Sequence, residues 1–255
     1  TGNIGIFATN SITRNILADR IGGLNEYHQE NWYYYPPYYG DYEYNYSYLS
    51  SYYSGYDDYS DNEAYVYIYD TLDTRGDGTS EGTINVLASN TINQNVTVTD
   101  LIGYYNDDSY NDAQVYTEYP FYSDLGDINL TAKNDLTRAI SASSIGGVAG
   151  YLYSEEYDFD SNGTTDYYSS YGNNYYYGFD DNYYNYAYLE TGDEISSRNG
   201  SVTLTAQNIV DSQVSATGDN TIGYYYDDSY NYAEVYTYGY GDYSIATTGN
   251  IALSA

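Results

Sequence analysis

The stretch GDINLTAKNDLTRAISAS, residues 126–143, decides the fold of this chain. Apolar residues recur at every second position, as in Ile128, Leu130 and Ala132, with polar residues between them. A period of two is typical of a β-strand that buries one face. This stretch therefore predicts a strand with an aliphatic inner face.

The same frame occurs four times: Gly, alternating apolar residues, Ala-x-Asn and a further apolar residue. It reads GNIGIFATNSI at 2–12, GTINVLASNTI at 82–92, GDINLTAKNDL at 126–136 and GSVTLTAQNIV at 200–210. Each copy continues through small or β-branched residues to an Ile-Gly pair, which gives rung bodies at 2–23, 82–103, 126–147 and 200–223. A single short body cannot bury its own apolar face, but stacked bodies can. We therefore expect an all-β fold, a parallel β-helix or β-solenoid.

One asparagine occupies the same place in every frame, namely Asn10, Asn90, Asn134 and Asn208. An Asn amide can bond to an identical amide on the rung above, and Asn also tolerates tight bends. We expect these residues to form a structural Asn ladder at one corner of the rungs. An ordinary turn asparagine with no stack is the alternative.

The stretch at 126–143, and the shorter GNIALSA at 249–255, resemble the haemagglutinin-type repeats of large bacterial exoproteins, the filamentous-haemagglutinin-like family. The resemblance covers the rung bodies alone. It implies a parallel β-helix, secretion, an extracellular or cell-surface location, and adhesive or structural work rather than catalysis.

Four insertions separate the rung bodies, at 24–81, 104–125, 148–199 and 224–248, and they contain all 45 tyrosines. Long and short insertions alternate, which predicts a first super-repeat at 1–125, a second at 126–248 and the start of a further rung at 249–255. We expect the insertions to leave one corner of each rung as β-hairpins or loops. Disorder is the alternative, because charge and Gly, Asn and Ser content are high.

Regular alternation of tyrosine within the insertions favours ordered strands, because alternate side chains of an extended chain share a face. The predicted surface aromatic ladder comprises Tyr42, Tyr44, Tyr46 and Tyr48; Tyr65, Tyr67 and Tyr69; and Tyr236, Tyr238 and Tyr240.

The chain has 6 Lys+Arg against 37 Asp+Glu, for a net charge of −31. Nucleic acids and anionic membranes are bound through Lys and Arg, so this charge argues against both as partners. No apolar run approaches the roughly 18 residues that span a bilayer, so we expect no membrane insertion. The N-terminus TGNIGIFATN lacks an initiator Met and a charged leader, which indicates a piece of a longer chain.

A candidate calcium loop reads DFDSNGTTD at 158–166. Its spacing places oxygen ligands as an EF-hand-like loop does, but Ser169 stands where such a loop has its bidentate acid. A solvated turn is the alternative. The candidate ligands are Asp158, Asp160, Asn162, Thr164 and Asp166.

Two acidic pairs, Asp107/Asp108 and Asp227/Asp228, occupy equivalent places in the short insertions. Stacked carboxylates repel one another, so either cations bind between the pairs or the side chains point into solvent. We treat them as weaker metal candidates than the loop at 158–166. Calcium is the one cofactor that the sequence suggests.

Catalysis has little support in the sequence, which contains one histidine, His28, and no cysteine. Nucleophile and His-metal arrangements need such residues in combination, so we expect no enzyme. The preferred hypothesis is a structural or adhesive extracellular fibre whose partner is itself, through end-to-end stacking or tandem repeats in one long chain. The alternatives are a carbohydrate- or cation-binding surface module, acting on glycans or cell surfaces, and a tyrosine-mediated charge relay.

Overall fold

The computed structural model describes residues 2–35, 42–79, 81–218, 222–238, 245–247 and 249–255. These residues form strands, and no helix occurs among them, so none of the described segments is a helix that could cross a membrane. Most neighbouring strands pair in parallel. The predicted all-β class is confirmed for this part of the chain.

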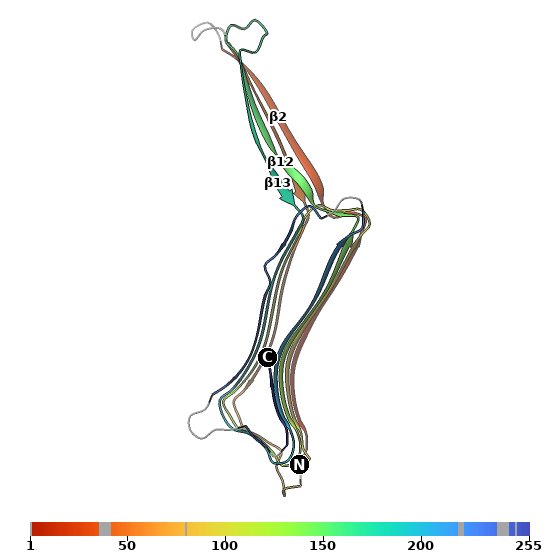
Figure 1. Ribbon diagram of the computed structural model, residues 1–255, viewed down its shortest axis with the longest axis vertical. Coiled ribbons are helices and arrows are strands. Elements are labelled where there is room, and N and C mark those ends of the chain that lie inside the picture. The colour runs from red at the N-terminus through yellow and green to blue at the C-terminus, as the bar shows by residue number, and fades with distance from the viewer. Residues whose placement is uncertain (1, 36–41, 80, 219–221, 239–244, 248) are drawn as a thin grey trace.

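The chain follows one order of strands four times, and we call each traverse a pass. A pass begins with a long strand, returns along a second long strand and ends in a short one (Figure 1). Pass 1 covers 4–73, pass 2 covers 84–123, pass 3 covers 128–197 and pass 4 covers 202–247. A fifth pass begins with β20 (Ile251–Ser254).

The opening strands of the passes form a parallel sheet that we call the first sheet. They are β1 (Ile4–Ala18), β6 (Ile84–Val98), β10 (Ile128–Ala142) and β16 (Val202–Ala216), followed by β20. Neighbouring strands pair without a shift in register, so Ile84 lies between Ile4 and Ile128. Equivalent residues of the repeated frame therefore form columns across the sheet.

The returning strands form the second sheet: β4 (Tyr56–Ile68), β8 (Tyr105–Thr117), β14 (Phe179–Thr191), and in pass 4 β17 (Tyr225–Asp227) with β18 (Tyr230–Thr237). Short strands close each pass: β5 (Leu72–Asp73), β9 (Phe121–Ser123), β15 (Ile195–Ser197) and β19 (Ile245–Thr247). At the turn between the long strands, β7 (Leu101–Ile102) pairs with β11 (Ser144–Ile145).

The core lies between the first and second sheets. Ile84 and Leu130 from the first sheet, and Val115 and Leu189 from the second, are all 0 % exposed and belong to one packed cluster. Burying such a side chain stabilises a fold by about 1.5–3 kcal/mol. The apolar half of each alternating strand is therefore what holds the two sheets together.

A column of glycines explains why every frame begins with Gly. A Cβ on Gly126 would lie 2.2 Å from the carbonyl oxygen of Gly82, and one on Gly200 would lie 2.2 Å from that of Gly126. Gly249 repeats the arrangement on Gly200 at 2.4 Å. Successive passes approach too closely at this position for any side chain.

Two β-hairpins project from the body and form a four-stranded antiparallel sheet that we call the arm (Figure 1). Pass 1 supplies β2 (Gly23–Tyr35) and β3 (Tyr42–Ser54), and pass 3 supplies β12 (Gly147–Asp158) and β13 (Tyr167–Tyr177). Their order is β13-β12-β3-β2. Each hairpin begins after a glycine with positive φ, Gly22 at 65° and Gly146 at 72°, a conformation that other residues rarely adopt.

The arm explains why long and short connections alternate. A hairpin is two strands wide, which is about 9.6 Å at a strand spacing of 4.8 Å. Two passes of the body have the same width. A hairpin on every second pass therefore lets β3 pair with β12 while the body strands stay in register.

The structure divides the predicted insertions differently from the sequence analysis. Among the described residues, the hairpins β2–β3 and β12–β13 leave the body, whereas β8 from insertion 104–125 lies inside the second sheet. The inner face of β8 carries small and polar side chains as well as apolar ones, and its outer face carries tyrosines and acids. Neither face is uniformly apolar, so the period of two is hard to recognise in the sequence. Asn90 also lies within β6 rather than at a corner.

Candidate functional site

Tyrosines on the outer face of the second sheet stack from one pass to the next. The rings of Tyr110 and Tyr184 are 5.0 Å apart with an interplanar angle of 4°, and those of Tyr184 and Tyr230 are 4.8 Å apart at 8°. Tyr186 and Tyr232 stack beside them at 5.2 Å and 8°. These spacings follow the strand separation, because the paired residues are neighbours in a parallel ladder. We call this face the tyrosine face.

Carboxylates lie beside tyrosines on this face and accept hydrogen bonds from their hydroxyls. Tyr188 donates to Glu190 two residues further on at 2.5 Å, and Tyr232 donates to Glu234 in the same way. Residues two apart on a strand share a face, so Tyr-x-Glu places donor beside acceptor. The repeated motif therefore produces a network of phenols bonded to carboxylates.

Asp112 is the most enclosed acid of the tyrosine face, at 4 % exposed. It accepts hydrogen bonds from Tyr65 at 2.8 Å, from Tyr110 at 3.4 Å and from the Gln114 amide at 2.8 and 2.9 Å. No sequence motif marks this residue. Its signal is its position in the ladder beside three donors, which requires the register to be known.

Burial and neighbouring acids keep these phenols protonated. Burial, with the charge of Asp112, raises the pKa of Tyr110 to about 12. Burial, with the adjacent Tyr232 and Asp112, raises the pKa of Tyr186 to about 12. Tyr110 and Tyr186 therefore keep their protons to a higher pH than an ordinary phenol, whose pKa is about 10.

The predicted aromatic ladder is distributed over the tyrosine face, the arm and the segments beside them. Tyr65 and Tyr67 lie on β4 with their ring centroids 5.9 Å apart. The ring centroids of Tyr236 and Tyr238 are 5.7 Å apart. Tyr69 follows β4 and is 66 % exposed. Tyr240 lies outside the described residues.

The other predicted tyrosines belong to the arm. Tyr44, Tyr46 and Tyr48 share one face of β3 and contact tyrosines of β12 from the other hairpin, with Tyr44 and Tyr157 at 4.7 Å and Tyr46 and Tyr153 at 6.2 Å. Tyr42 begins the same strand. The tyrosines of the two hairpins therefore pack against each other, which the sequence alternation alone could not specify.

The predicted asparagines form a chain of side-chain hydrogen bonds. Asn90 donates to Asn134 at 3.0 Å, and Asn134 donates to Asn208 at 2.9 Å. Asn10, at the edge, donates instead to the backbone carbonyl of Glu63. Asn90 and Asn134 are 0 % exposed, so these bonds lie inside the molecule rather than at a surface bend.

A second asparagine column, missed in the sequence, faces the first one from the second sheet. Hydrogen bonds of 3.3, 2.7 and 2.9 Å between side-chain amides link its successive members, which are Asn62, Asn111, Asn185 and Asn231. The signal was present as a repeated Asn-x-Ala-x-Val/Leu frame, as in NDAQV at 111–115. Its order, Asn-x-Ala, is the reverse of the Ala-x-Asn of the first sheet, because the two long strands of a pass run in opposite directions.

A buried charge cluster lies further along the core, and its centre is Arg138. This side chain is fully buried, pairs with Asp107 at 2.6 Å and with Asp181, and donates to Gln94 at 2.8 Å. Gln94 in turn donates to Asp58 at 2.6 Å. These partners stabilise the buried guanidinium of Arg138, because an unpaired charge in the interior has a high free-energy cost.

Burial affects the pKa of both Asp107 and Arg138. Burial raises the pKa of the Asp107 carboxyl, against the opposing effect of the Arg138 guanidinium. Burial alone would lower the pKa of Arg138, but Asp107 and Asp181 together raise it. The cluster is a structural charge network between the two sheets, and the sequence analysis did not predict it.

The predicted acidic pair Asp107/Asp108 separates onto opposite faces of the second sheet. Asp107 points into the core toward Arg138, whereas Asp108 points outward and accepts from the Asn182 amide at 3.1 Å. Alternation along a strand requires this separation, because successive side chains leave on opposite sides. In pass 4 the register places Asp227 beside Asp181, and Asp228 is an exposed residue on the neighbouring strand edge.

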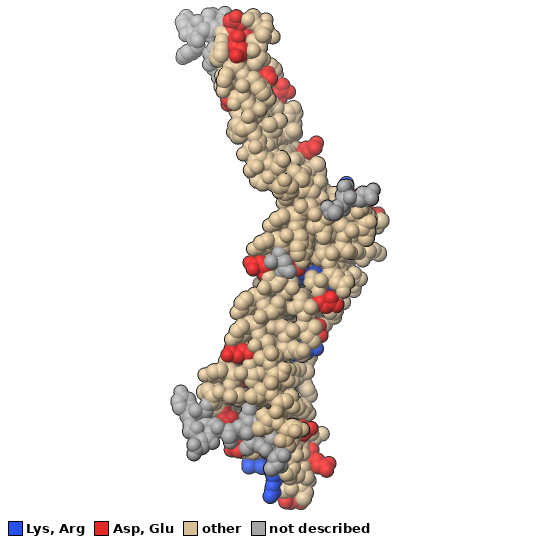
Figure 2. Space-filling model, in the orientation of Figure 1, with Lys and Arg blue, Asp and Glu red and all other residues tan. Residues whose placement is uncertain are grey.

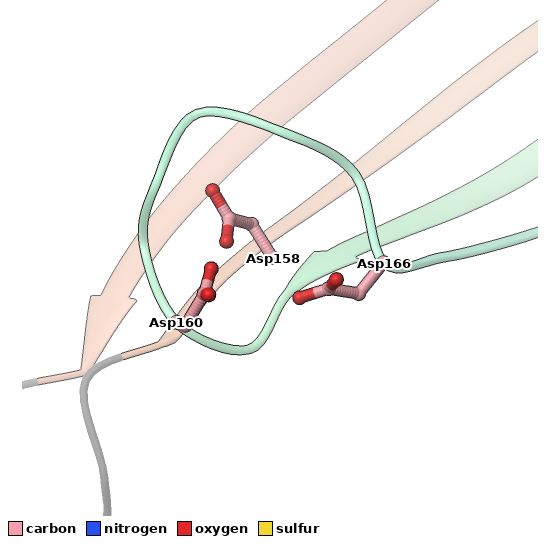
Figure 3. Close-up of side chains that lie close together, drawn as sticks. All are labelled: Asp158, Asp160 and Asp166. Atoms are coloured by element: carbon pink, nitrogen blue, oxygen red, sulfur yellow. The ribbon is translucent and has the colours of Figure 1, made fainter.

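The candidate calcium loop connects β12 to β13 at the far end of the arm. Carboxylate oxygens of Asp158, Asp160 and Asp166 lie within 4.8 Å of one another, and Figure 3 shows the three side chains turned toward the inside of the loop. The oxygens of Asp158 accept hydrogen bonds from the backbone N–H of Asn162 at 3.2 Å and Gly163 at 2.7 Å.

Backbone donors therefore provide part of the neutralisation that a cation would supply. Burial would raise the pKa of Asp158, but the N–H groups of Gly163 and Asn162 lower it below its ordinary value. Asp166 similarly accepts from the backbone N–H of Phe159 at 2.8 Å. The Asn162 amide oxygen accepts from Thr164 N–H at 2.8 Å, so these predicted ligands also stabilise the turn itself.

The surface seen in Figure 2 carries acidic groups at scattered points along the body and arm and few basic ones. No protein-family model, no curated protein and no solved structure matches this chain. Its function is therefore argued from its own residues.

Proposed function

We propose that this chain is a stretch of a parallel β-solenoid that works as a structural and adhesive extracellular fibre. The observation that carries the proposal is the unbroken register of the columns. Equivalent glycines, asparagines and aliphatic residues of the repeated frame lie on one another through four passes, and Ile251 continues the column of Val202 into a fifth. Such columns extend at no structural cost by adding further passes.

The last strand exposes aliphatic residues of the kind that the middle passes bury. Ile84 and Ile128 in the middle passes are 0 % exposed, whereas Ile251 and Leu253 in the last strand are 48 % and 57 % exposed. Exposed aliphatic residues next to unpaired strand edges favour pairing with a further strand. A following pass would cover these residues as pass 3 covers those of pass 2.

The surface supports an adhesive role. Phenol hydroxyls and carboxylates cover the tyrosine face, and the arm exposes aromatic rings on both sides, including Trp32 at 62 % and Tyr171 at 60 %. Aromatic side chains with a polar tip are well suited to contact surfaces. Repetition along a fibre would multiply many weak contacts into strong attachment.

A carbohydrate-binding module is the second candidate, and one groove favours it. The groove has a volume of about 460 Å³ on the outer face of the second sheet and is lined by Tyr59, Asp108, Asn182 and Asp228, among others. Tyr59 is 69 % exposed and could stack on a sugar while the acids and the amide bond to its hydroxyls. The stacked rings of Tyr184 and Tyr230 face each other and are less available.

Two experiments test these proposals. Antibodies raised against the chain should label filaments on intact cells or in shed material, and labelling confined to the cell interior contradicts the extracellular fibre. A glycan array should show no binding that Tyr59→Ala removes. Binding lost in that variant but kept in Tyr69→Ala, an exposed tyrosine outside the groove lining, would favour the carbohydrate module.

A further inference from the structure

Two tyrosines of the arm join their hydroxyl groups beside a carboxylate. The hydroxyl oxygens of Tyr44 on β3 and Tyr153 on β12 are 3.2 Å apart, and Tyr153 donates to Glu155 at 2.8 Å. Because a tyrosine hydroxyl has a single proton, Tyr44 is the donor in its contact with Tyr153. The Tyr44 hydroxyl also lies 3.4 Å from Glu155. Two phenols from different hairpins therefore share one acceptor.

The body contains a second group of the same composition. The hydroxyl oxygens of Tyr116 on β8 and Tyr238, which follows β18, are 3.3 Å apart, and Tyr116 donates to Glu118. In both groups the glutamate stands two residues after the tyrosine that donates to it. We call Tyr44, Tyr153 and Glu155 the arm triad, and we call Tyr116, Tyr238 and Glu118 the body triad.

The body triad depends on a glycine in the pass that separates its two tyrosines. Tyr116 belongs to pass 2 and Tyr238 to pass 4, so Tyr238 reaches across pass 3. Gly192 follows β14 of pass 3, and a Cβ on it would lie 3.2 Å from Cζ and from the hydroxyl oxygen of Tyr238. The missing side chain leaves room for Tyr238 to reach Tyr116.

Paired hydroxyls bring together the atoms that oxidative phenol coupling joins. In this reaction the new carbon–carbon bond links the ring carbons next to the two C–O carbons, so the hydroxyls of the product lie side by side. The hydroxyl contacts of 3.2 and 3.3 Å already place those ends of the rings together. Each carboxylate is positioned to take up a phenol proton as the electron leaves.

The donating phenols keep their protons until they are oxidised. Hydrogen bonds to Tyr44 and Glu155 raise the pKa of Tyr153, and hydrogen bonds to Glu118 and Tyr238 raise the pKa of Tyr116. Neither phenol ionises near neutral pH, so its proton has to leave with the electron. All four tyrosines are half-buried, which leaves part of each side chain open to solvent and to an oxidant.

We propose that the two triads are sites of oxidative cross-linking, at which hydrogen peroxide activated by a peroxidase joins Tyr44 to Tyr153 and Tyr116 to Tyr238. Each phenol loses one electron and one proton, and the carboxylate passes the proton of the donating phenol to water. The two phenoxyl radicals form one carbon–carbon bond, and the hydrogens on the bonded carbons move to the oxygens. One hydrogen peroxide molecule takes up two electrons and two protons and becomes two water molecules.

The two links join alternate passes. The arm triad connects the hairpins of passes 1 and 3, and the body triad connects passes 2 and 4. A covalent link between distant segments restricts the unfolded chain, as a disulfide does. The oxidised chain should therefore unfold at a higher temperature than the untreated chain. Both links lie within one chain, so this inference goes beyond the proposed fibre and does not depend on it.

The experiment treats a dilute solution of the full chain with hydrogen peroxide and a peroxidase, and maps the cross-linked peptides by tandem mass spectrometry. We expect a linked peptide for each triad, lighter by two hydrogen atoms than the sum of its parts. A mixture of isotope-labelled and unlabelled chains separates links within a chain from links between chains. Treatment of the chain unfolded in urea should yield neither linked peptide preferentially.

Each triad is the matched control for the other. Tyr44→Phe should remove the arm link and leave the body link, and Tyr116→Phe should do the reverse. Gly192→Val should displace Tyr238 and remove the body link alone. Glu155→Gln keeps an acceptor but removes the base, so it should slow the arm link alone. Circular dichroism checks that every variant is folded.

Cross-links that follow exposure alone would overturn the proposal. Tyr69 and Tyr176 are 66 % and 62 % exposed, and linking there at the yield of the triads would show that the triads are not special. An equal yield between Tyr184 and Tyr230, whose rings stack at 4.8 Å, would show that ring proximity suffices without the carboxylate. Absence of both triad links from the folded wild type would reject the proposal outright.

Discussion

Arg138 Nη2 lies 2.6 Å from Asp107 Oδ2 in a part of the interior where neither side chain is exposed. The two residues belong to different passes and to different sheets. Their contact therefore joins neighbouring passes and the two sheets at one point. A charge network of this kind is strongly destabilising when broken on one side, because the remaining charges stay buried.

Replacement of Arg138 by leucine should lower the free energy of unfolding by about 3–5 kcal/mol, because Asp107 and Asp181 would lose their counter-charge. The matched control is Lys133→Leu, which removes a half-buried cation paired with Asp135 at 3.2 Å and should cost at most about 1 kcal/mol. Urea unfolding followed by circular dichroism measures both. Equal losses for the two variants would show that the buried network is not special.

Substitution of Gly126 by alanine should destabilise the chain by about 1–3 kcal/mol or more, because the added methyl group would press on the carbonyl of Gly82. Gly2→Ala is the control at the free end of the same column, where the added group meets nothing. Thermal unfolding compares the two. A wild-type melting temperature for Gly126→Ala contradicts the close approach of the passes.

Replacement of Asn134 by alanine interrupts the asparagine column between Asn90 and Asn208. We expect a loss of about 1–3 kcal/mol, the cost of leaving buried polar groups without partners. Asn129→Ala removes a half-buried asparagine on the opposite face of β10, which donates to Asn85 of β6, and it should cost less. If chemical denaturation ranks these two in the reverse order, the ladder has little energetic importance.

Alkaline titration tests the tyrosine face. The pKa of Tyr186 is raised from 10.0 to about 12 in the folded chain, so the folded state holds this proton more tightly than the unfolded state does. The stability that follows from this is fully present below pH 10 and is lost as the pH rises toward 12. Tyr186→Phe should show a shallower loss over that interval when unfolding is measured at several pH values. An unchanged slope contradicts the assignment.

Calorimetric titration with Ca²⁺ tests the loop between β12 and β13. We expect weak binding, with a dissociation constant of about 10⁻⁴–10⁻³ M, because one strong ligand of an EF-hand-like loop is missing and backbone N–H groups already bond to Asp158. Asp160→Asn should abolish it, whereas Asp77→Asn, a change in an unrelated turn, should leave it unchanged. Heats no larger than dilution with the wild type remove calcium from the account.

The first sheet was accessible from the sequence because its inner positions are aliphatic and its frame is regular, as in Ile128, Leu130 and Ala132. The second sheet was not, since tyrosines and acids on its outer face dominate the composition and conceal the inner Ala113 and Val115. The Tyr-rich insertion 104–125 was therefore expected to leave the body as a hairpin or loop. Instead, half of the residues of β8 face the core.

The residues of the candidate site could be predicted from the sequence to different degrees, for similar reasons. The acidic cluster at 158–166 and the asparagine column could be located because their residues repeat or keep a fixed spacing in the chain. Arg138 could not, because nothing in the stretch around it indicates that Asp107 and Asp181 face it across the core. Pairing across sheets depends on the register and on where the chain turns, and neither is encoded in one local motif.

The axial repeat of native filaments distinguishes a continuous stack of passes from any other assembly. Cryo-electron microscopy of the native material should show a strong axial spacing of about 4.8 Å from the stacked passes, with a weaker one of about 9.6 Å. The longer spacing arises because hairpins occur on every second pass. We expect filaments with both spacings. Discrete particles, or filaments without an axial spacing near about 4.8 Å, would exclude the proposed fibre.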